Sequence, residues 1–190
     1  MNKKVLIIGG PTGSGESTIT KELMKKYPFF QKLIAATSRP MRSNEKETDY
    51  YFFSKEHFEK EIEKENIIEY TYMQDRGVYY GTYKPELEKK LKLGSIIANV
   101  DHVGVKYFKK NFNALAIFIK PESIGSLKKR LIKRNPEITE GELLLRLNNA
   151  KAELANEECF YDFSVVNKDG KLAEALTEIE QILKNNGYIK

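Results

Sequence analysis

The chain has 190 residues, 41% hydrophobic and 31% charged, which suits one globular domain with a full hydrophobic core. No apolar stretch approaches the roughly 20 residues of a membrane span, and the N-terminus lacks the apolar segment of a signal peptide, so we expect a cytoplasmic protein with no membrane partner. The charges of both signs are mostly interleaved, which favours solvated helix faces, and the modest net charge of +5 suits an anionic small ligand as well as nucleic acid. Of the two, we expect the small ligand and no nucleic acid.

Short apolar runs alternate with helical patterns along the chain. Buried strands are predicted at residues 5–8, 96–100, 114–119 and 163–166. Helices are predicted at residues 17–26, 85–92, 101–110, 123–133, 140–157 and 171–184. Because continuously apolar strands alternating with helices are typical of a parallel sheet covered on both faces, the sequence predicts an α/β fold with a mostly parallel sheet.

Residues 37–83 interrupt this alternation. They hold a polar loop, the aromatic run 50–53, a helix near 55–64 and two short strand-like pieces that end at Tyr79 and Tyr80. We expect an inserted substrate-binding lobe here. A second interruption, the polar stretch 134–139 between two helices, is expected to belong to a mobile lid.

Few residues suit metal or thiol chemistry. Cys159 is the single cysteine, which excludes an internal disulfide, and we expect it to be packed in a reducing compartment. His57 and His102 are the only histidines and lie too far apart in the sequence to argue for a metal site.

A glycine-rich loop follows the first predicted strand. Its sequence, Gly10-Pro11-Thr12-Gly13-Ser14-Gly15-Glu16-Ser17, matches the phosphate-binding motif GxxxxGK[ST] at every fixed position except one. Glycines let consecutive backbone N–H groups surround an anion, and the following helix adds the positive end of its dipole. Ser17 stands where the motif places the hydroxyl that binds Mg²⁺, and Glu16 where it places the lysine that reaches the β- and γ-phosphates.

Further motifs follow the loop in a fixed order. In the stretch 37–42, Arg39 and Arg42 lie three residues apart in a loop, a spacing suited to bidentate phosphate contacts. After them come Glu45, Tyr50, Glu69, Tyr80, Thr82, Asp101, Arg130, Arg134, Arg146 and Asn167. In this order the motifs closely resemble those of the guanylate kinase family of P-loop nucleoside monophosphate kinases, over nearly the whole chain.

The resemblance implies a phosphotransferase that converts ATP and GMP to ADP and GDP, with Mg²⁺ accompanying ATP. It implies a core at residues 1–36, 84–125 and 158–190, a GMP-binding lobe at 37–83 and a lid at 126–157. It also implies a monomer or homodimer whose partners are these nucleotides.

The same resemblance assigns individual residues. The phosphate of GMP would be held by Arg39, Arg42, Tyr50 and Tyr80, with Glu45 also in the GMP site, and guanine by Glu69, Thr82 and Asp101. A carboxylate accepts the adjacent N1–H and N2–H₂ donors of guanine, which adenine lacks. The ATP phosphates would lie on residues 10–18, ending at Thr18, and the adenine beside Asn167. Arg130, Arg134 and Arg146 would be the catalytic residues that neutralise the transferred phosphoryl group.

Three positions depart from the family pattern. Glu16 replaces the lysine, Asn99 replaces an acidic residue close to Mg²⁺, and Ala35 replaces a serine beside the GMP pocket. A unit charge ~4 Å from a phosphate oxygen is worth about 4 kcal/mol at an effective dielectric of ~20, so exchanging Lys for Glu could reduce activity strongly. Lys3, Lys4 or a lysine of the lid could compensate.

These departures leave two functions open. Glu16 and Asn99 favour a catalytically inactive module that binds GMP or a phosphorylated peptide. The lid arginines favour the enzyme, because a peptide-binding module has no use for a lid that closes over ATP.

Overall fold

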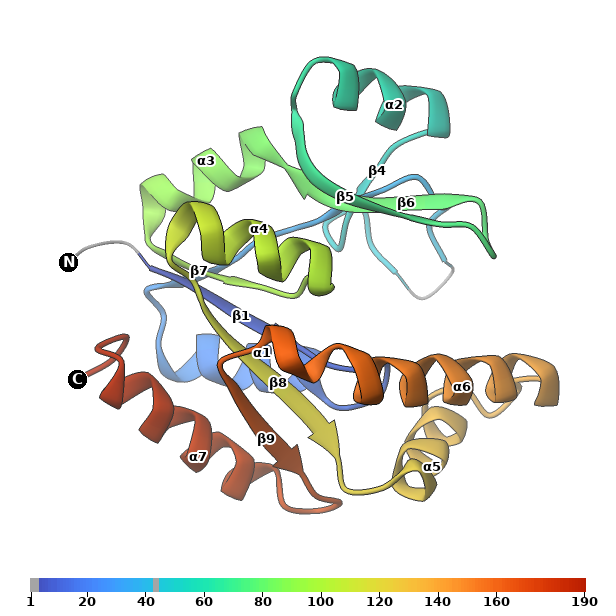
Figure 1. Cartoon of the computed structure of the whole chain (residues 1–190), viewed down its shortest axis with the longest axis vertical. Helices are drawn as coiled ribbons and strands as arrows, with labels where there is room; N and C mark the ends of the chain where they lie inside the picture. The colour runs from blue at the N-terminus through green and yellow to red at the C-terminus, as the bar shows by residue number, and fades with distance from the viewer. Residues whose placement is uncertain (1–3, 43–44) are drawn as a thin grey trace. The chain divides into compact units, whose positions relative to one another are not determined.

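A computed structural model of the chain describes residues 4–42 and 45–190, so the start of the predicted core and Lys3 lie outside the described residues. The strands are β1 (Val5–Gly9), β2 (Phe30–Lys32), β3 (Ala36–Thr37), β4 (Tyr51–Phe52), β5 (Ile67–Met73), β6 (Val78–Tyr83), β7 (Ser95–Ala98), β8 (Leu115–Pro121) and β9 (Phe163–Asn167). The helices are α1 (Glu16–Lys26), α2 (Lys55–Glu63), α3 (Lys84–Leu93), α4 (His102–Phe112), α5 (Ile124–Arg134), α6 (Glu140–Asn156), the 3₁₀ turn η1 (Glu158–Phe160) and α7 (Leu172–Asn185) (Figure 1).

A five-stranded parallel sheet in the order β2-β7-β1-β8-β9 confirms the predicted α/β fold. All four predicted strands are present. β1, β7 and β8 are apolar runs whose side chains are largely buried, whereas the edge strand β9 buries only Val165 and Asn167. The edge strand β2 was not predicted. It has three residues and only Phe30 is buried, so it lacks the apolar run that marks a central parallel strand.

The stretch between β2 and α3 forms a second sheet in the order β4-β3-β6-β5. The β3–β4 pair is parallel, and the β3–β6 and β5–β6 pairs are antiparallel. This sheet has four strands where two were predicted, because β3 and β4 are only two residues long each. Its core gathers Ala36, Phe58 and Ile67 with surrounding aromatic rings, and Ser54 caps α2 by accepting a hydrogen bond from the His57 backbone N–H at 3.1 Å.

The chain divides into two compact units. The first comprises Pro28–Ala114 together with the chain up to Leu6, and it contains the four-stranded sheet with α2, α3 and α4. The second comprises Ile7–Tyr27 and Leu115–Lys190, and it contains the glycine-rich loop, α1 and the helices α5, α6 and α7. The loop of Arg39 and the glycine-rich loop therefore belong to different units.

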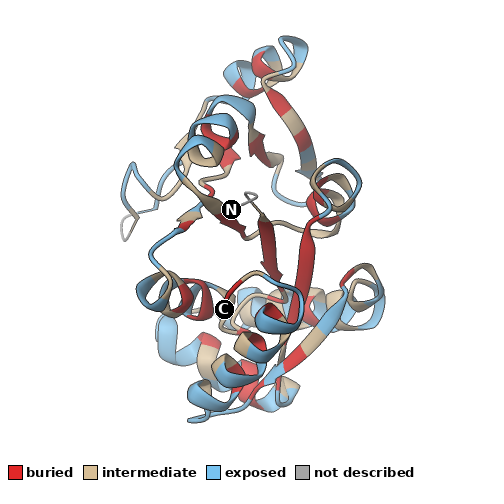
Figure 2. Cartoon of the chain, turned by 90° about the vertical axis from the view of Figure 1, so that its left-hand side faces the viewer, coloured by how far each residue is buried: buried red, intermediate tan, exposed pale blue. Residues whose placement is uncertain are grey.

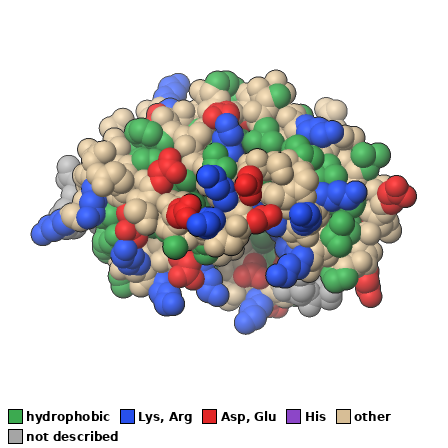
Figure 3. Space-filling model, turned by 90° about the horizontal axis from the view of Figure 1, so that it is seen from below, with side chains coloured by type: hydrophobic (Ala, Val, Ile, Leu, Met, Phe, Trp, Pro, Cys, Tyr) green, Lys and Arg blue, Asp and Glu red, His purple; other side chains and the backbone are tan. Residues whose placement is uncertain are grey.

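The central strands β1, β7 and β8 of the five-stranded sheet are buried, whereas the helices keep an exposed face (Figure 2). Cationic and anionic side chains are intermixed on the face drawn in Figure 3, as their interleaving in the sequence suggests. Cys159 is exposed on η1, so the prediction that it is packed was wrong; the turn that follows α6 leaves it at the surface. Among the described helices, none has the length and apolar character needed to cross a membrane.

Candidate functional site

The glycine-rich loop joins β1 to α1 in the second unit, at the strand–helix junction that the motif requires. The Ser14 backbone N–H donates to the Pro11 carbonyl at 2.9 Å, which closes the turn. Gly15 has φ of 103°, and a Cβ there would lie 2.2 Å from Asn167 Nδ2. Position 15 therefore requires glycine for both its backbone conformation and the close approach of Asn167.

Asn167 and Arg130 bind the backbone carbonyls of the glycine-rich loop. Asn167 Nδ2 donates to the Ser14 carbonyl at 2.8 Å. The Arg130 guanidinium donates to the carbonyls of Gly13 at 3.4 Å, Ser14 at 3.1 Å and Asn167 at 2.7 Å. It also pairs with the Asp169 carboxylate at 2.7 Å. These contacts bind loop carbonyls to the segment after β9, which is the arrangement expected when the loop's N–H groups are to face an anion.

A cavity of about 360 Å³ opens beside the loop. It is lined by Gly13, Gly15, Glu16, Ser17, Thr18, Arg130, Arg134, Asn167, Lys168, Asp169, Gly170 and Leu172. Ser17 and Thr18 are exposed, so their hydroxyl groups are accessible to a ligand. In the described part of the chain, no group of three or more His, Cys, Asp or Glu side chains could hold a metal ion.

The charge of Glu16 depends on pH. Its side chain is partly buried, and desolvation, reinforced by repulsion from Glu153 and opposed by attraction to Arg134, raises its pKa to about 8. Near neutral pH this carboxyl group is therefore mostly protonated. The fixed negative charge assumed from the sequence holds only in alkaline solution.

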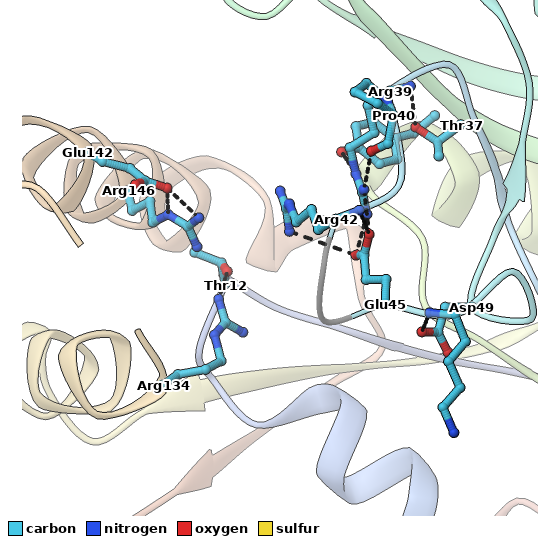
Figure 4. Close-up of polar contacts among 12 residues, drawn as sticks. Thr12, Thr37, Arg39, Pro40, Arg42, Glu45, Asp49, Arg134, Glu142 and Arg146 are labelled. Carbon is cyan, nitrogen blue, oxygen red and sulfur yellow. Dashed lines mark hydrogen bonds and ion pairs between the residues drawn. The ribbon is translucent and has the colours of Figure 1, made fainter. Parts of the chain in front are cut away.

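The three predicted catalytic arginines differ in their contacts. Arg130 is committed to the loop carbonyls, and Arg134 reaches the Thr12 hydroxyl at 3.4 Å (Figure 4). Arg146 instead pairs with Glu142 on its own helix, with N···O distances of 3.1 and 2.6 Å. The structure thus brings Arg130 and Arg134 to the glycine-rich loop, whereas the contacts of Arg146 lie along α6.

Removing the Arg130 guanidinium is expected to loosen the loop. Arg130→Met should destabilise the protein by about 1.5–3 kcal/mol, since charge-assisted hydrogen bonds to partly buried carbonyls are lost. The melting temperature should fall by about 2–4 °C for each kcal/mol. Arg134→Met, which removes the longer hydrogen bond to Thr12 and the attraction to Glu16, is the matched control and should lower the melting temperature less. Equal melting temperatures for the two variants, measured by calorimetry, would contradict this role.

A second group of predicted residues, here called the Arg39 cluster, lies in the first unit around Arg39. Arg39 itself is only 8% exposed. Its terminal nitrogens donate to the two oxygens of Glu45 at 2.6 Å each (Figure 4). Its Nε donates to the Tyr80 hydroxyl at 3.0 Å. The guanidinium also lies over the Tyr50 ring, 5.0 Å from its centroid. The hydrogen bond and charge of Arg39 lower the pKa of Glu45 to about 2.

Arg42 completes this cluster. Its backbone N–H donates to Glu45 at 3.0 Å, while its guanidinium is exposed, with one nitrogen 3.9 Å from the same carboxylate. The structure therefore brings together five predicted residues, namely Arg39, Arg42, Glu45, Tyr50 and Tyr80. One buried and one exposed guanidinium share a single carboxylate, so the cluster keeps an excess positive charge for an anion.

The predicted base-reading residues also lie in the first unit. Glu69 is 8% exposed and accepts a hydrogen bond from the Thr82 hydroxyl at 2.5 Å. Burial raises the pKa of Glu69 to about 7; the Thr82 hydrogen bond lowers the pKa and the charge of Asp101 raises it. Asp101 also caps α4, accepting hydrogen bonds from the backbone N–H groups of Val103 at 3.0 Å and Gly104 at 3.3 Å.

Sequence reasoning missed several residues around the glycine-rich loop. Lys168 and Asp169 line the cavity, and Glu153 of α6 acts on the charge of Glu16. The one local signal was that Lys168 and Asp169 directly follow Asn167. No motif marks Glu153, because only the packing of α6 brings it near the loop.

The sequence and the structure of the chain are both similar to those of known guanylate kinases. A family model described as guanylate kinase matches residues 2–186. The chain is 38% identical to the guanylate kinase of Porphyromonas gingivalis over 186 residues, covering 95% of each protein. It is 35% identical to the guanylate kinase of Clostridium tetani over 181 residues, covering 94% of this chain and 84% of that protein. The crystal structure of guanylate kinase from Anaplasma phagocytophilum superposes with a TM-score of 0.73 at 27% identity, covering 97% of this chain and 86% of the other.

Proposed function

The chain belongs to the guanylate kinase family, and from this premise we propose how its residues divide the work of phosphorylating GMP with ATP. The reaction moves the γ-phosphoryl group of ATP onto a phosphate oxygen of GMP and leaves ADP and GDP. No general base is needed, because the acceptor is already an anion. The observation that carries the proposal is the buried Glu69 carboxylate in the same unit as the Arg39 cluster, a pairing suited to guanine and to phosphate.

In the first unit, the Arg39 cluster binds the phosphate of GMP. Arg42 is exposed and supplies direct contacts, and Glu45 holds Arg39 in a fixed orientation by a two-point ion pair. The hydroxyl groups of Tyr50 and Tyr80 add neutral donors. Glu69, oriented by Thr82 and accompanied by Asp101, accepts the N1–H and N2–H₂ donors of guanine.

In the second unit, residues 10–18 bind the phosphates of ATP. The support is the strand–helix junction, the accessible hydroxyls of Ser17 and Thr18, and the adjoining cavity. Ser17 would hold Mg²⁺, which, when bound with ATP, neutralises charge on the transferred phosphoryl group. Arg134 contacts Thr12 of the loop, so it is placed to bind phosphate, and Arg146 would have to exchange Glu142 for the nucleotide.

The roles of Arg130 and Asn167 include holding the loop. Both donate to the Ser14 carbonyl, so we assign them a positioning function beside the catalytic and adenine-binding roles implied by the family. We keep the division into core (1–36, 84–125 and 158–190), GMP-binding lobe (37–83) and lid (126–157). A cytoplasmic location suits both nucleotide substrates, and monomer and homodimer both remain compatible with these roles.

A coupled assay of ADP release with GMP, AMP or UMP as acceptor tests the function. We expect turnover with GMP and little with AMP or UMP, because neither presents the paired donors that Glu69 accepts. Calorimetric binding of GMP without ADP release would instead identify an inactive binding module. Equal turnover with AMP would refute guanine recognition by Glu69.

A further inference from the structure

The cavity beside the glycine-rich loop contains a lysine that the motif does not place there. Its charged lining residues are Glu16, Arg130, Arg134, Lys168 and Asp169. Arg130 is committed to Asp169 and to the loop carbonyls. Arg134 contacts Thr12 and is attracted to Glu16. Within residues 4–42 and 45–190, the Lys168 ammonium has no ion pair or hydrogen bond, so its charge is available to a ligand.

The residues on both sides of Lys168 are joined to the loop, Asn167 directly and Asp169 through Arg130. Asn167 donates its side-chain amide to the Ser14 carbonyl at 2.8 Å, and its own carbonyl accepts from Arg130 at 2.7 Å. On the other side, Asp169 pairs with Arg130 at 2.7 Å. The base of the Lys168 side chain is therefore fixed relative to the loop, although the ammonium itself is exposed.

Other lysines do not meet these conditions. Lys128, Lys129 and Lys133 lie on α5 of the predicted lid, and none of them lines the cavity. In the described part of the chain, Lys168 is the one lysine that does. A lysine needs only a flexible stem and a nearby anion to act as a point charge for phosphate, so Lys168 can do so although it follows β9 and does not belong to the loop.

We propose that Lys168 supplies the phosphate-binding positive charge that the loop lacks at position 16, donating to the phosphates of a nucleotide bound at the loop. Lys168 would be a further residue of the ATP site proposed above, and the identity of the ligand rests on that proposed function. It requires only that a nucleoside triphosphate binds there, whether or not GMP is phosphorylated.

Binding of a non-hydrolysable ATP analogue with Mg²⁺, measured by titration calorimetry, tests the proposal. Lys168→Met should weaken the affinity by about tenfold, since a unit charge close to phosphate is lost from a partly exposed site. Lys168→Arg should bind within about threefold of the wild type, because the charge is kept. The matched control is Lys171→Met, which removes a lysine of the same segment that pairs with Glu174 and does not line the cavity; its affinity should be unchanged.

Combining these variants with Glu16→Lys separates a specific role from a general effect of charge. If Lys168 replaces the missing lysine, Glu16→Lys should improve analogue binding more in the Lys168→Met background than in the wild type. Equal gains in both backgrounds would overturn the proposal, and so would Lys168→Met binding within about twofold of the wild type. Weaker binding by Lys168→Met in a protein that never phosphorylates GMP would support Lys168 and refute the proposed function, so the two failures are distinguishable.

Discussion

Glu16→Lys is expected to accelerate phosphoryl transfer from ATP to GMP, by about tenfold at pH 7 and about 100-fold at pH 9, without altering GMP affinity. The difference arises because the pKa of Glu16 is about 8. Below that pH the carboxyl group is mostly neutral, and the substitution adds one positive charge. Above it the carboxylate repels the ATP phosphates, and the substitution changes the charge by two units. The wild-type rate should therefore fall as the pH rises through about 8, whereas the variant should show no such fall. Steady-state rates with saturating GMP across this range measure both effects.

Glu16→Gln is the matched control, because it mimics the protonated carboxyl group at every pH. Its rate should equal that of the wild type at pH 7 and exceed it at pH 9. Adding Asn99→Asp to Glu16→Lys should raise the rate further if Mg²⁺ lacks a nearby carboxylate. A wild type that already turns over at the ordinary ~1–100 s⁻¹ of kinases, with no gain from Glu16→Lys, would show that another cation performs the task of the lysine. In that event Lys168 is the residue to examine.

The fold could be predicted where one physical signal dominated. The strand Val5–Gly9 and the helix that follows it were predictable, because a fully buried apolar run leads into a glycine-rich turn. The short strands Phe30–Lys32 and Ala36–Thr37 were not. Their backbone pairing is supplied by distant strands, and so few residues leave no periodic pattern in the sequence.

The sequence predicted which residues belong to the candidate site, but it did not predict which of them contact each other. The motif residues around Arg39 fall into one cluster, as their order along the chain suggested. Arg130 and Gly13, however, are 117 residues apart in sequence, and only the packing of α5 reveals that this arginine contacts the loop backbone. Likewise, the pKa of Glu16 depends on burial and on Glu153 and Arg134, which its residue type alone does not show.

GMP affinity is expected to rise steeply as the pH increases from about 6 to 8. The pKa of Glu69 is raised to about 7, chiefly by burial, so much of this carboxyl group is protonated at neutral pH. Only the carboxylate can accept both guanine donors, and GMP binding should therefore release a proton. Below pH 7 the affinity should fall by about tenfold for each pH unit. Titration calorimetry in buffers with different ionisation enthalpies measures the proton release directly.

Glu69→Gln should weaken GMP binding by ~1–3 kcal/mol and remove its pH dependence, because the amide replaces a charged acceptor with a mixed donor and acceptor. The exposed Glu63→Gln is the matched control and should change neither property. Unchanged GMP affinity in Glu69→Gln would exclude Glu69 from the site.

The folding stability of the wild type should fall with rising pH, whereas its GMP affinity rises. Because the folded state binds the proton more tightly than the unfolded state, whose carboxyl has a pKa near 4.5, the wild type loses stability as the pH rises from about 4.5 through 7. The amide has no proton to lose, so Glu69→Gln should melt above the wild type at pH 8 and gain less at pH 5. A variant that binds GMP poorly yet melts higher would show that the buried carboxylate is kept for recognition of guanine at the expense of stability.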